Sequence, residues 1–189
     1  MKYKERQEGS RMGKYFIAIV PPEPVLVKVR EIKESICLQY NSCGALRSPG
    51  HITLHSPFEW KEEGKLIEIL SEFKFDEKDF QILLKGFNCF EPRVIYVDVL
   101  RNEKLFYLQR ELVYFVKSKL RLFNQSDDKR GFHPHVTVAF RGLKKAVFNE
   151  IYNEYKEKEF NMDFNCKTFS LLKQLGQKWE VIENFDLIN

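Results

Sequence analysis

Apolar and polar residues alternate along several short segments of this chain, and that spacing predicts β-strands. The runs Tyr15–Val20 and Val94–Val99 are mostly apolar. Two further segments begin at His51 and His133, and apolar residues take every second position in both. Because side chains two apart in a strand share a face, each of these last two segments predicts a strand with one polar face.

Other segments place apolar residues three or four positions apart, which predicts amphipathic helices. Helices are expected from Val25 to about Ile36, from Lys65 to Phe73, from Leu105 to about Leu122 and from about Lys144 to Tyr155. The remaining strands are expected at Phe80–Lys85 and in a closing hairpin that turns at Gly176, with arms Phe164–Leu172 and Trp179–Ile182. Together these elements predict an α+β fold.

The order strand, helix, loop, strand occurs twice, and each copy ends in a histidine-containing strand. The first copy runs from Tyr15 to the strand at His51, and the second from Val94 to the strand at His133. A repeat of this kind favours two lobes whose equivalent strands meet around a pseudo-twofold cleft. We expect one bilobal domain over residues 13–189, preceded by a polar, disordered extension at residues 1–12.

Composition limits the functions that the chain can have. Its 189 residues are 43% hydrophobic, which is enough for one substantial core. The net charge of +4 permits an anionic ligand but is far from the clustered charge of strong nucleic-acid binders. The apolar run at Tyr15 is too short for a signal-peptide core or a membrane span, so a cytoplasmic protein without membrane contact is expected.

The cysteines lack the spacing of a zinc site or of a disulfide framework. They are Cys37, Cys43, Cys89 and Cys166, and we expect them to be reduced and mostly packed. Chelation of a metal by histidines two apart on a strand is an alternative use of the imidazoles. The absence of paired carboxylates beside either histidine segment weighs against a hydrolytic metal site.

All four histidines lie in two segments, and each segment contains the triplet His-x-Thr. The triplets are His51 with Thr53 and His135 with Thr137. Each strand would therefore present an imidazole beside a hydroxyl on one face. Histidine has a pKa of about 6.5, so one ring can act as base while the other acts as acid, and the hydroxyls can bind phosphate oxygens. This pattern predicts a metal-free site for phosphoryl chemistry.

The sequence predicts roles within the site as well as its members. We expect His135 as the base and His51 as the acid, although the pseudo-symmetry permits the reverse. His55 and His133 fall on the same predicted faces and are expected in supporting or surface roles. The structural alternative is that each histidine simply hydrogen-bonds its threonine on an exposed strand.

The strings His51–Phe58 and His133–Phe140 resemble the two signature motifs of the two-histidine (2H) phosphoesterase superfamily. That superfamily includes the 2′-5′ RNA ligase-like proteins and the RNA 2′,3′-cyclic phosphodiesterases. The resemblance covers nearly the whole chain from about Gly13. It implies two antiparallel sheets flanking a central cleft with helices outside, catalysis by His51 and His135, and substrate binding by Thr53 and Thr137.

The same resemblance implies a function. We expect metal-independent hydrolysis of a 2′,3′-cyclic phosphate on an RNA 3′ end or a small nucleotide, with a 2′-phosphate product, no cofactor and a monomeric enzyme. The alternatives are a 2′-5′ RNA ligase or 2′-5′ phosphodiesterase, and a non-catalytic RNA- or nucleotide-binding module. Some family members have an arginine where this chain has Phe140. Arg141 follows directly and, if the strand continues regularly, it either shares the face of His135 and binds substrate or caps the strand end in solvent.

Several other side chains lie close enough to the motifs to line the site. Phe58, Tyr96 and Trp179 could stack on a base or pack in the core. Lys173 and Arg47 could contact phosphate or remain solvated.

Overall fold

The computed structural model describes residues 12–77, 79–124, 131–140 and 142–187. Its first half contains β1 (Gly13–Ile19), α1 (Val25–Tyr40), the 3-10 helix η1 (Gly44–Arg47), β2 (Ile52–Trp60), α2 (Glu63–Ser71) and β3 (Phe80–Phe90). The second half contains β4 (Val94–Val99), α3 (Glu103–Leu120), β5 (His135–Phe140), α4 (Lys145–Tyr155), β6 (Asn161–Cys166), β7 (Thr168–Leu175) and β8 (Lys178–Asp186).

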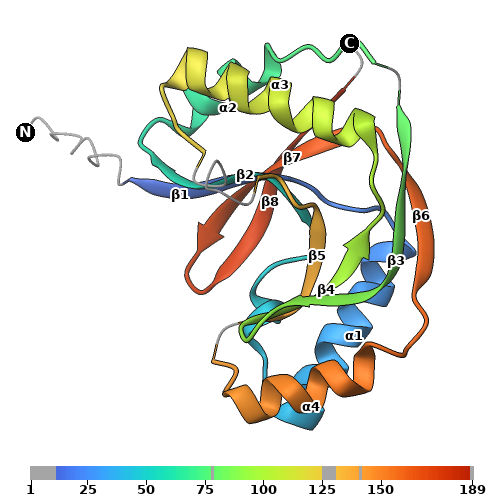
Figure 1. Cartoon of the computed structure of the whole chain (residues 1–189). Coiled ribbons are helices and arrows are strands. Elements are labelled where there is room, and N and C mark those ends of the chain that lie inside the picture. Colours follow the sequence, from blue (N-terminus) through green and yellow to red (C-terminus); the bar gives the residue numbers. More distant parts are fainter. Residues whose placement is uncertain (1–11, 78, 125–130, 141, 188–189) are drawn as a thin grey trace, which may run out of the picture.

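The strands form two four-stranded sheets, and all pairings within them are antiparallel. The first sheet has the order β2-β1-β7-β8 and the second β5-β4-β3-β6 (Figure 1). The two strands that carry the His-x-Thr triplets, β2 and β5, lie at the edges of their sheets and contact each other. The expected α+β fold with two antiparallel sheets is confirmed.

The helix of each repeat packs on the sheet of the other repeat. α1 follows β1 in the chain but contacts β5, β6 and α4, whereas α3 follows β4 but contacts β2. Figure 1 shows α1 and α4 together on the sheet that contains β3 and β4, with α2 and α3 at the opposite end of the molecule. The two repeats are therefore interlocked rather than set side by side.

Periodic burial explains why α3 forms and where it packs. Asn102 caps its first turn by accepting a hydrogen bond from the backbone N–H of Leu105 at 3.1 Å. Arg121 ends it in the left-handed conformation, with φ of 55°. Its buried face repeats every three or four residues, through Leu105, Leu108, Leu112, Val116 and Leu120. Each such side chain contributes about 1.5–3 kcal/mol when it leaves water.

One predicted strand proves to be two. The segment Phe164–Leu172 was expected as a single arm of the hairpin, but β6 ends at Cys166 and pairs with β3, while β7 begins at Thr168 and pairs with β1. The chain thus changes sheets at Lys167. Both strands contribute apolar residues to the same core, so the apolar pattern continues from β6 into β7. The pattern alone therefore does not show that the pairing strand changes from β3 to β1.

The expectation of reduced thiols is wrong for one pair of cysteines. Cys37 and Cys43 form a disulfide, with their Cα atoms 4.4 Å apart. The helix α1 ends between them at Asn41, whose φ of 52° turns the chain back on itself. Cys89 and Cys166 are free thiols, and Cys166 is buried as expected.

Two predictions fall on parts of the chain that the structure does not describe. Residues 1–11 of the expected extension and Arg141 lie outside the described residues, while Met12 is exposed. Among the helices that the structure describes, none has both the length and the apolar character needed to cross a membrane.

Candidate active site

A short turn before β2 holds His51. The Nδ1 atom of His51 donates a hydrogen bond to the carbonyl oxygen of Pro49 at 2.8 Å. The neighbouring carbonyl, that of Ser48, accepts a hydrogen bond from Nζ of Lys33 on α1 at 3.1 Å. A Cβ atom on Gly50 would lie 2.9 Å from Cγ1 of Val29, so α1 and this turn approach more closely than any other residue would allow.

His135 is held in the same way at the start of β5. Its Nδ1 lies 2.8 Å from the carbonyl oxygen of His133, two residues earlier, just as Nδ1 of His51 faces Pro49. A carbonyl oxygen can only accept, so Nδ1 carries the hydrogen in both rings. In each histidine Nε2 remains for proton transfer, and both residues are half-buried.

Each His-x-Thr strand carries an irregularity directly after its threonine. Thr53 lies opposite Ala18, yet His55 lies opposite the adjacent Ile17, so Leu54 is an extra residue. The second strand repeats this feature, because Thr137 lies opposite Tyr96 and Ala139 lies opposite Ile95, which leaves Val138 extra. The paired residue after each bulge, His55 or Ala139, turns to the core face of its sheet and is buried.

The bulge corrects the prediction for His55. Regular alternation placed His55 on the face of His51, but the extra residue turns it to the opposite face, where it is fully buried. Its ring packs edge-on against Phe58 at 5.4 Å, and its Nδ1 lies 2.9 Å from the carbonyl oxygen of Ser56. His55 is therefore a core residue. Phe58 is buried beside it and does not line the site.

The two threonines face the same side as the histidines. Thr53 shares its face with Ala18 and, further across the sheet, with Ser170, which is buried. Within the described residues neither the hydroxyl of Thr53 nor that of Thr137 has a hydrogen-bond partner. Both hydroxyls are half-buried and available to bind an anion.

Aromatic rings support each imidazole. The ring of Phe16 lies 4.8 Å from that of His51, and Trp179 packs edge-on against Phe16 at 4.8 Å. On the second strand, the ring of His135 contacts Phe90 at 5.1 Å and Tyr96 at 4.9 Å, and these two rings also contact each other at 4.7 Å. These contacts limit the rotation of both rings, so each Nε2 has a fixed direction.

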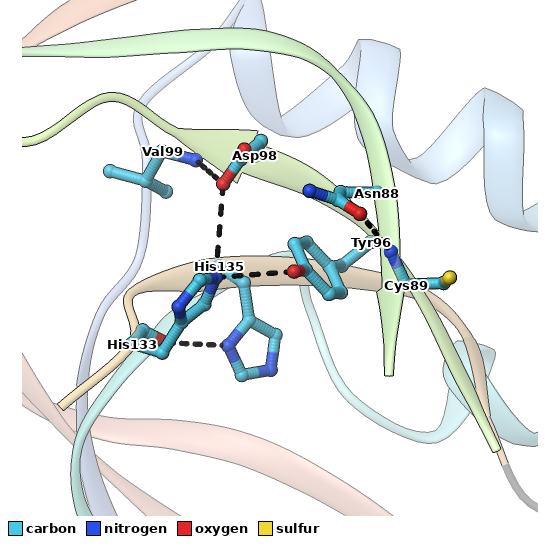
Figure 2. Close-up of polar contacts among 7 residues, drawn as sticks. All are labelled: Asn88, Cys89, Tyr96, Asp98, Val99, His133 and His135. Carbon is cyan, nitrogen blue, oxygen red and sulfur yellow. Dashed lines mark hydrogen bonds and ion pairs between the residues drawn. The ribbon is translucent and has the colours of Figure 1, made fainter. Parts of the chain in front are cut away.

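His133 extends the second half of the site. Figure 2 shows its ring beside that of His135, with the hydroxyl of Tyr96 3.1 Å from its Nε2. The carboxylate of Asp98 lies 4.0 Å from the same nitrogen. Asp98 is also directly opposite His135 in the β4–β5 pairing. Tyr96 is buried, and this burial and the charge of Asp98 raise its pKa to about 12, so it stays protonated.

The electrostatic surroundings of the two catalytic candidates differ. Burial lowers the pKa of His51 to about 4, and the positive charge of Lys33 acts in the same direction. The pKa of His135 is also lowered by burial and by the charge of His133, whereas the carbonyl of His133 and, to a smaller extent, the carboxylate of Asp98 oppose the change. Both rings thus have a lowered pKa, and they differ in their charged neighbours, which are Lys33 at His51 and His133 and Asp98 at His135.

The three basic residues predicted near the site differ in where they lie. Lys173 forms an ion pair with Glu63 at 2.6 Å and lies opposite Tyr15, on the face of the sheet away from His51. Arg47 lies at the end of η1, close in sequence to the turn that holds His51. For Arg141, the extra residue at Val138 removes the regular alternation on which its predicted direction rested.

Sequence reasoning missed Lys33. This lysine occupies a buried position of α1, in line with Val25, Val29 and Ile36, and only 3% of its surface is exposed. A lysine within an otherwise apolar helical face is the signal that could have identified it. Within the described ranges, no three His, Cys, Asp or Glu side chains gather as a metal-ligand set would require.

Paired His-x-Thr strands at the edges of two antiparallel sheets are the arrangement of the two-histidine phosphoesterase superfamily. The chain belongs to the 2′-5′ RNA ligase superfamily, whose family model matches residues 21–178.

Related proteins and solved structures agree with this membership. A "Putative phosphoesterase" of Geobacillus kaustophilus is 30% identical over 177 residues, which are 91% of this chain and 95% of that protein. One from Bacillus licheniformis is 28% identical over 92% of this chain and 98% of its own length. A Thermus thermophilus crystal structure has a TM-score of 0.62 at 20% identity, covering 92% of this chain and 97% of that one. Escherichia coli LigT complexed with 3′-AMP has a TM-score of 0.60 at 16% identity, covering 95% and 100%.

The close packing at Gly50 predicts an effect of substitution. Gly50→Ala should lower the free energy of unfolding by about 1–3 kcal/mol, because the new methyl group must displace the stiff, buried Val29. The matched control is Gly64→Ala in α2, where the added Cβ would meet no atom of another part of the chain within 4 Å and alanine should stabilise the helix by about 0.5–1 kcal/mol. Urea unfolding measures both. Equal stability of the Gly50 variant and wild type would contradict the packing argument.

The pKa of His51 predicts a pH dependence. Its ring should stay neutral at neutral pH and gain a proton only near pH 4, which ring chemical shifts in an NMR titration will report. Folding lowers this pKa from about 6.5, so the protonated ring is disfavoured in the folded state. Stability is therefore unaffected by this group above about pH 6.5 and falls as the pH drops from there toward 4. A midpoint at the ordinary value would show that burial and Lys33 do not act on this ring.

Proposed function

We propose that this protein is a metal-independent phosphodiesterase that opens 2′,3′-cyclic phosphates on an RNA 3′ end or a small nucleotide. The observation that supports this proposal is the duplicated arrangement of an imidazole, with Nδ1 occupied by a carbonyl, beside a threonine hydroxyl without a partner among the described residues. The strands that carry the two sets, β2 and β5, contact each other. Such a pair supplies a base, an acid and two donors to one phosphate.

The chemistry uses these four groups. A water molecule attacks phosphorus and gives its proton to Nε2 of one histidine. The bond from phosphorus to one ribose oxygen breaks, and that oxygen takes a proton from Nε2 of the other histidine. The hydroxyls of Thr53 and Thr137 donate hydrogen bonds to the non-bridging oxygens as their charge grows. The negative charge of the bound phosphate raises the pKa of both rings, which helps one of them to carry the proton.

The charges around the rings favour His51 as the base and His135 as the acid. Lys33 and burial keep His51 neutral and ready to accept a proton. The carboxylate of Asp98 favours the protonated form of His135, against burial and the charge of His133, which favour the neutral form. This assignment is opposite to the one that the sequence suggested, and the pseudo-symmetry of the backbone allows either.

The family membership supports a second candidate. The matched family is named the 2′-5′ RNA ligase superfamily. A ribose hydroxyl in place of water as the nucleophile would turn the same acid and base to ligation, and the reverse reaction would cleave a 2′-5′ diester. The names of the sequence relatives, in contrast, favour hydrolysis of phosphate esters.

The primary test is turnover of an RNA oligonucleotide and a mononucleotide that end in a 2′,3′-cyclic phosphate. His51→Ala and His135→Ala should each lower kcat by roughly two to four orders of magnitude without unfolding the protein. His133→Gln is the matched control. Its kcat should fall less, because the ring of His133 contacts Tyr96 and Asp98 beside the catalytic pair and is not itself the acid or the base.

Chelator and product analysis complete this test. Activity should persist in EDTA, and chromatography identifies the product as the 2′- or 3′-monophosphate. Loss of activity in EDTA that zinc restores would overturn the metal-independent mechanism. A folded protein that does not open the cyclic phosphate, but joins or cleaves 2′-5′ diesters, would favour the second candidate.

A sulfur leaving group tests the acid–base assignment. A thiolate leaves without protonation far more readily than an alkoxide, since the pKa of its conjugate acid is much lower. A cyclic phosphorothiolate with sulfur at the leaving position should therefore restore much of the activity of His135→Ala and little of that of His51→Ala. Rescue of His51→Ala instead would assign the acid to that residue.

A further inference from the structure

A basic pocket lies beside His51. Its volume is about 250 Å³, and it is formed by α1, η1, the turn before β2 and the start of β8. Four cationic residues and no carboxylate line it, namely Arg30, Lys33, Arg47 and Lys178. Arg30 is ion-paired with Glu34, whereas Arg47 and Lys178 have no ion pair with any described residue.

Two larger pockets are lined by carboxylates as well as by cations. One pocket of about 690 Å³ is lined by Lys173 among others. Its lining contains as many glutamates as lysines, namely Glu59, Glu62 and Glu63 against Lys14, Lys61 and Lys173. Another of about 440 Å³ lies between Val20 and β6, away from both histidines. The basic pocket adjoins His51 through the preceding residues Pro49 and Gly50.

Lys33 gives this pocket a buried positive charge. Its ammonium has three N–H groups, but only the carbonyl of Ser48 accepts from it among the described residues. A buried ammonium without a counter-charge is costly, and burial lowers the pKa of Lys33 to about 8. An anion in the pocket would supply both the missing charge and the missing acceptors.

Trp179 supplies the opposite wall and connects it to the site. It is half-buried and stands edge-on to Phe16, which in turn contacts His51. An indole face beside a cluster of cations is a combination that favours a base together with its phosphate. The pocket and the ring of His51 are thus separated by one aromatic ring, that of Phe16.

We propose that this pocket binds the non-reacting phosphate of the nucleotide next to the scissile one, with the attached base against Trp179. The inference rests on the proposed function and makes it more specific, because it predicts a preference for oligonucleotide ends over mononucleotides. Lys33 and Arg47 bind the second phosphate, and Trp179 binds the base.

Binding of product-like ligands tests this without turnover. The probes are a dinucleotide ending in a 2′-phosphate and the corresponding 2′-mononucleotide. In a Trp60→Phe background Trp179 is the single tryptophan, since the chain has two. We expect the dinucleotide to bind about tenfold more tightly and to quench Trp179 fluorescence, while the mononucleotide does not quench it.

Variants identify the groups responsible. Arg47→Gln and Lys33→Met should each remove most of the dinucleotide preference, and Arg47 has no ion pair within the described residues, so its substitution should not affect folding. The matched control is Arg110→Gln, an exposed arginine of α3 paired with Glu111, which should retain the preference. The ratio of kcat/KM for the two corresponding cyclic phosphates should fall in parallel with the ratio of affinities.

The outcomes separate this inference from the proposed function. Equal affinities without quenching, in a protein that opens cyclic phosphates, would overturn the inference and leave the function in place. A loss of preference in Arg110→Gln as large as in Arg47→Gln would also overturn it, because general electrostatic attraction would then explain the binding. Dinucleotide preference with quenching, but no hydrolysis, would support the pocket and refute the proposed reaction.

Discussion

The exchange of helices between the two repeats is the constraint on which the site depends. Because α1 leaves the first sheet and packs under β5, and α3 leaves the second and packs on β2, neither sheet can bury its apolar face without the other repeat. The apolar core accordingly extends across both sheets. The edge strands β2 and β5 are brought into contact by this interlocking. Edge strands expose unpaired backbone groups. Here the two edge strands contact each other, and they bring the two His-x-Thr triplets together.

The symmetry of the backbone is not matched by symmetry of charge. Both imidazoles donate Nδ1–H to a carbonyl two residues earlier, and both strands bulge after the threonine. Yet Ala18 lies opposite Thr53, where Tyr96 lies opposite Thr137, and Asp98 faces the second histidine alone. A duplicated scaffold gives two rings with the same free nitrogen, and the residues that differ between the copies give the two rings different charged neighbours. The proposed acid–base catalysis at one phosphate relies on such a difference between the rings.

The strengths and failures of sequence reasoning have identifiable causes. The triplets and the alternation around Val94–Val99 are local patterns, and local patterns predicted the strands and four helices well. His55 was misplaced because a single extra residue at Leu54 reverses the face of the residues after it, and no residue type marks that bulge. The change of sheet at Lys167 and the Cys37–Cys43 disulfide depend on which segments meet in space, which periodicity does not encode.

Lys33 joins the fold to the chemistry. It sits on the buried face of α1, and because α1 is exchanged to the other repeat, that face meets the turn that carries His51. A nonpolar residue would pack there at lower cost, since burying an ammonium beside a single carbonyl is unfavourable. Its charge helps to keep His51 neutral and faces a pocket without carboxylates. In the proposed mechanism the same lysine favours the base form of His51 and an anionic group next to it, so one buried charge would connect proton transfer with substrate recognition.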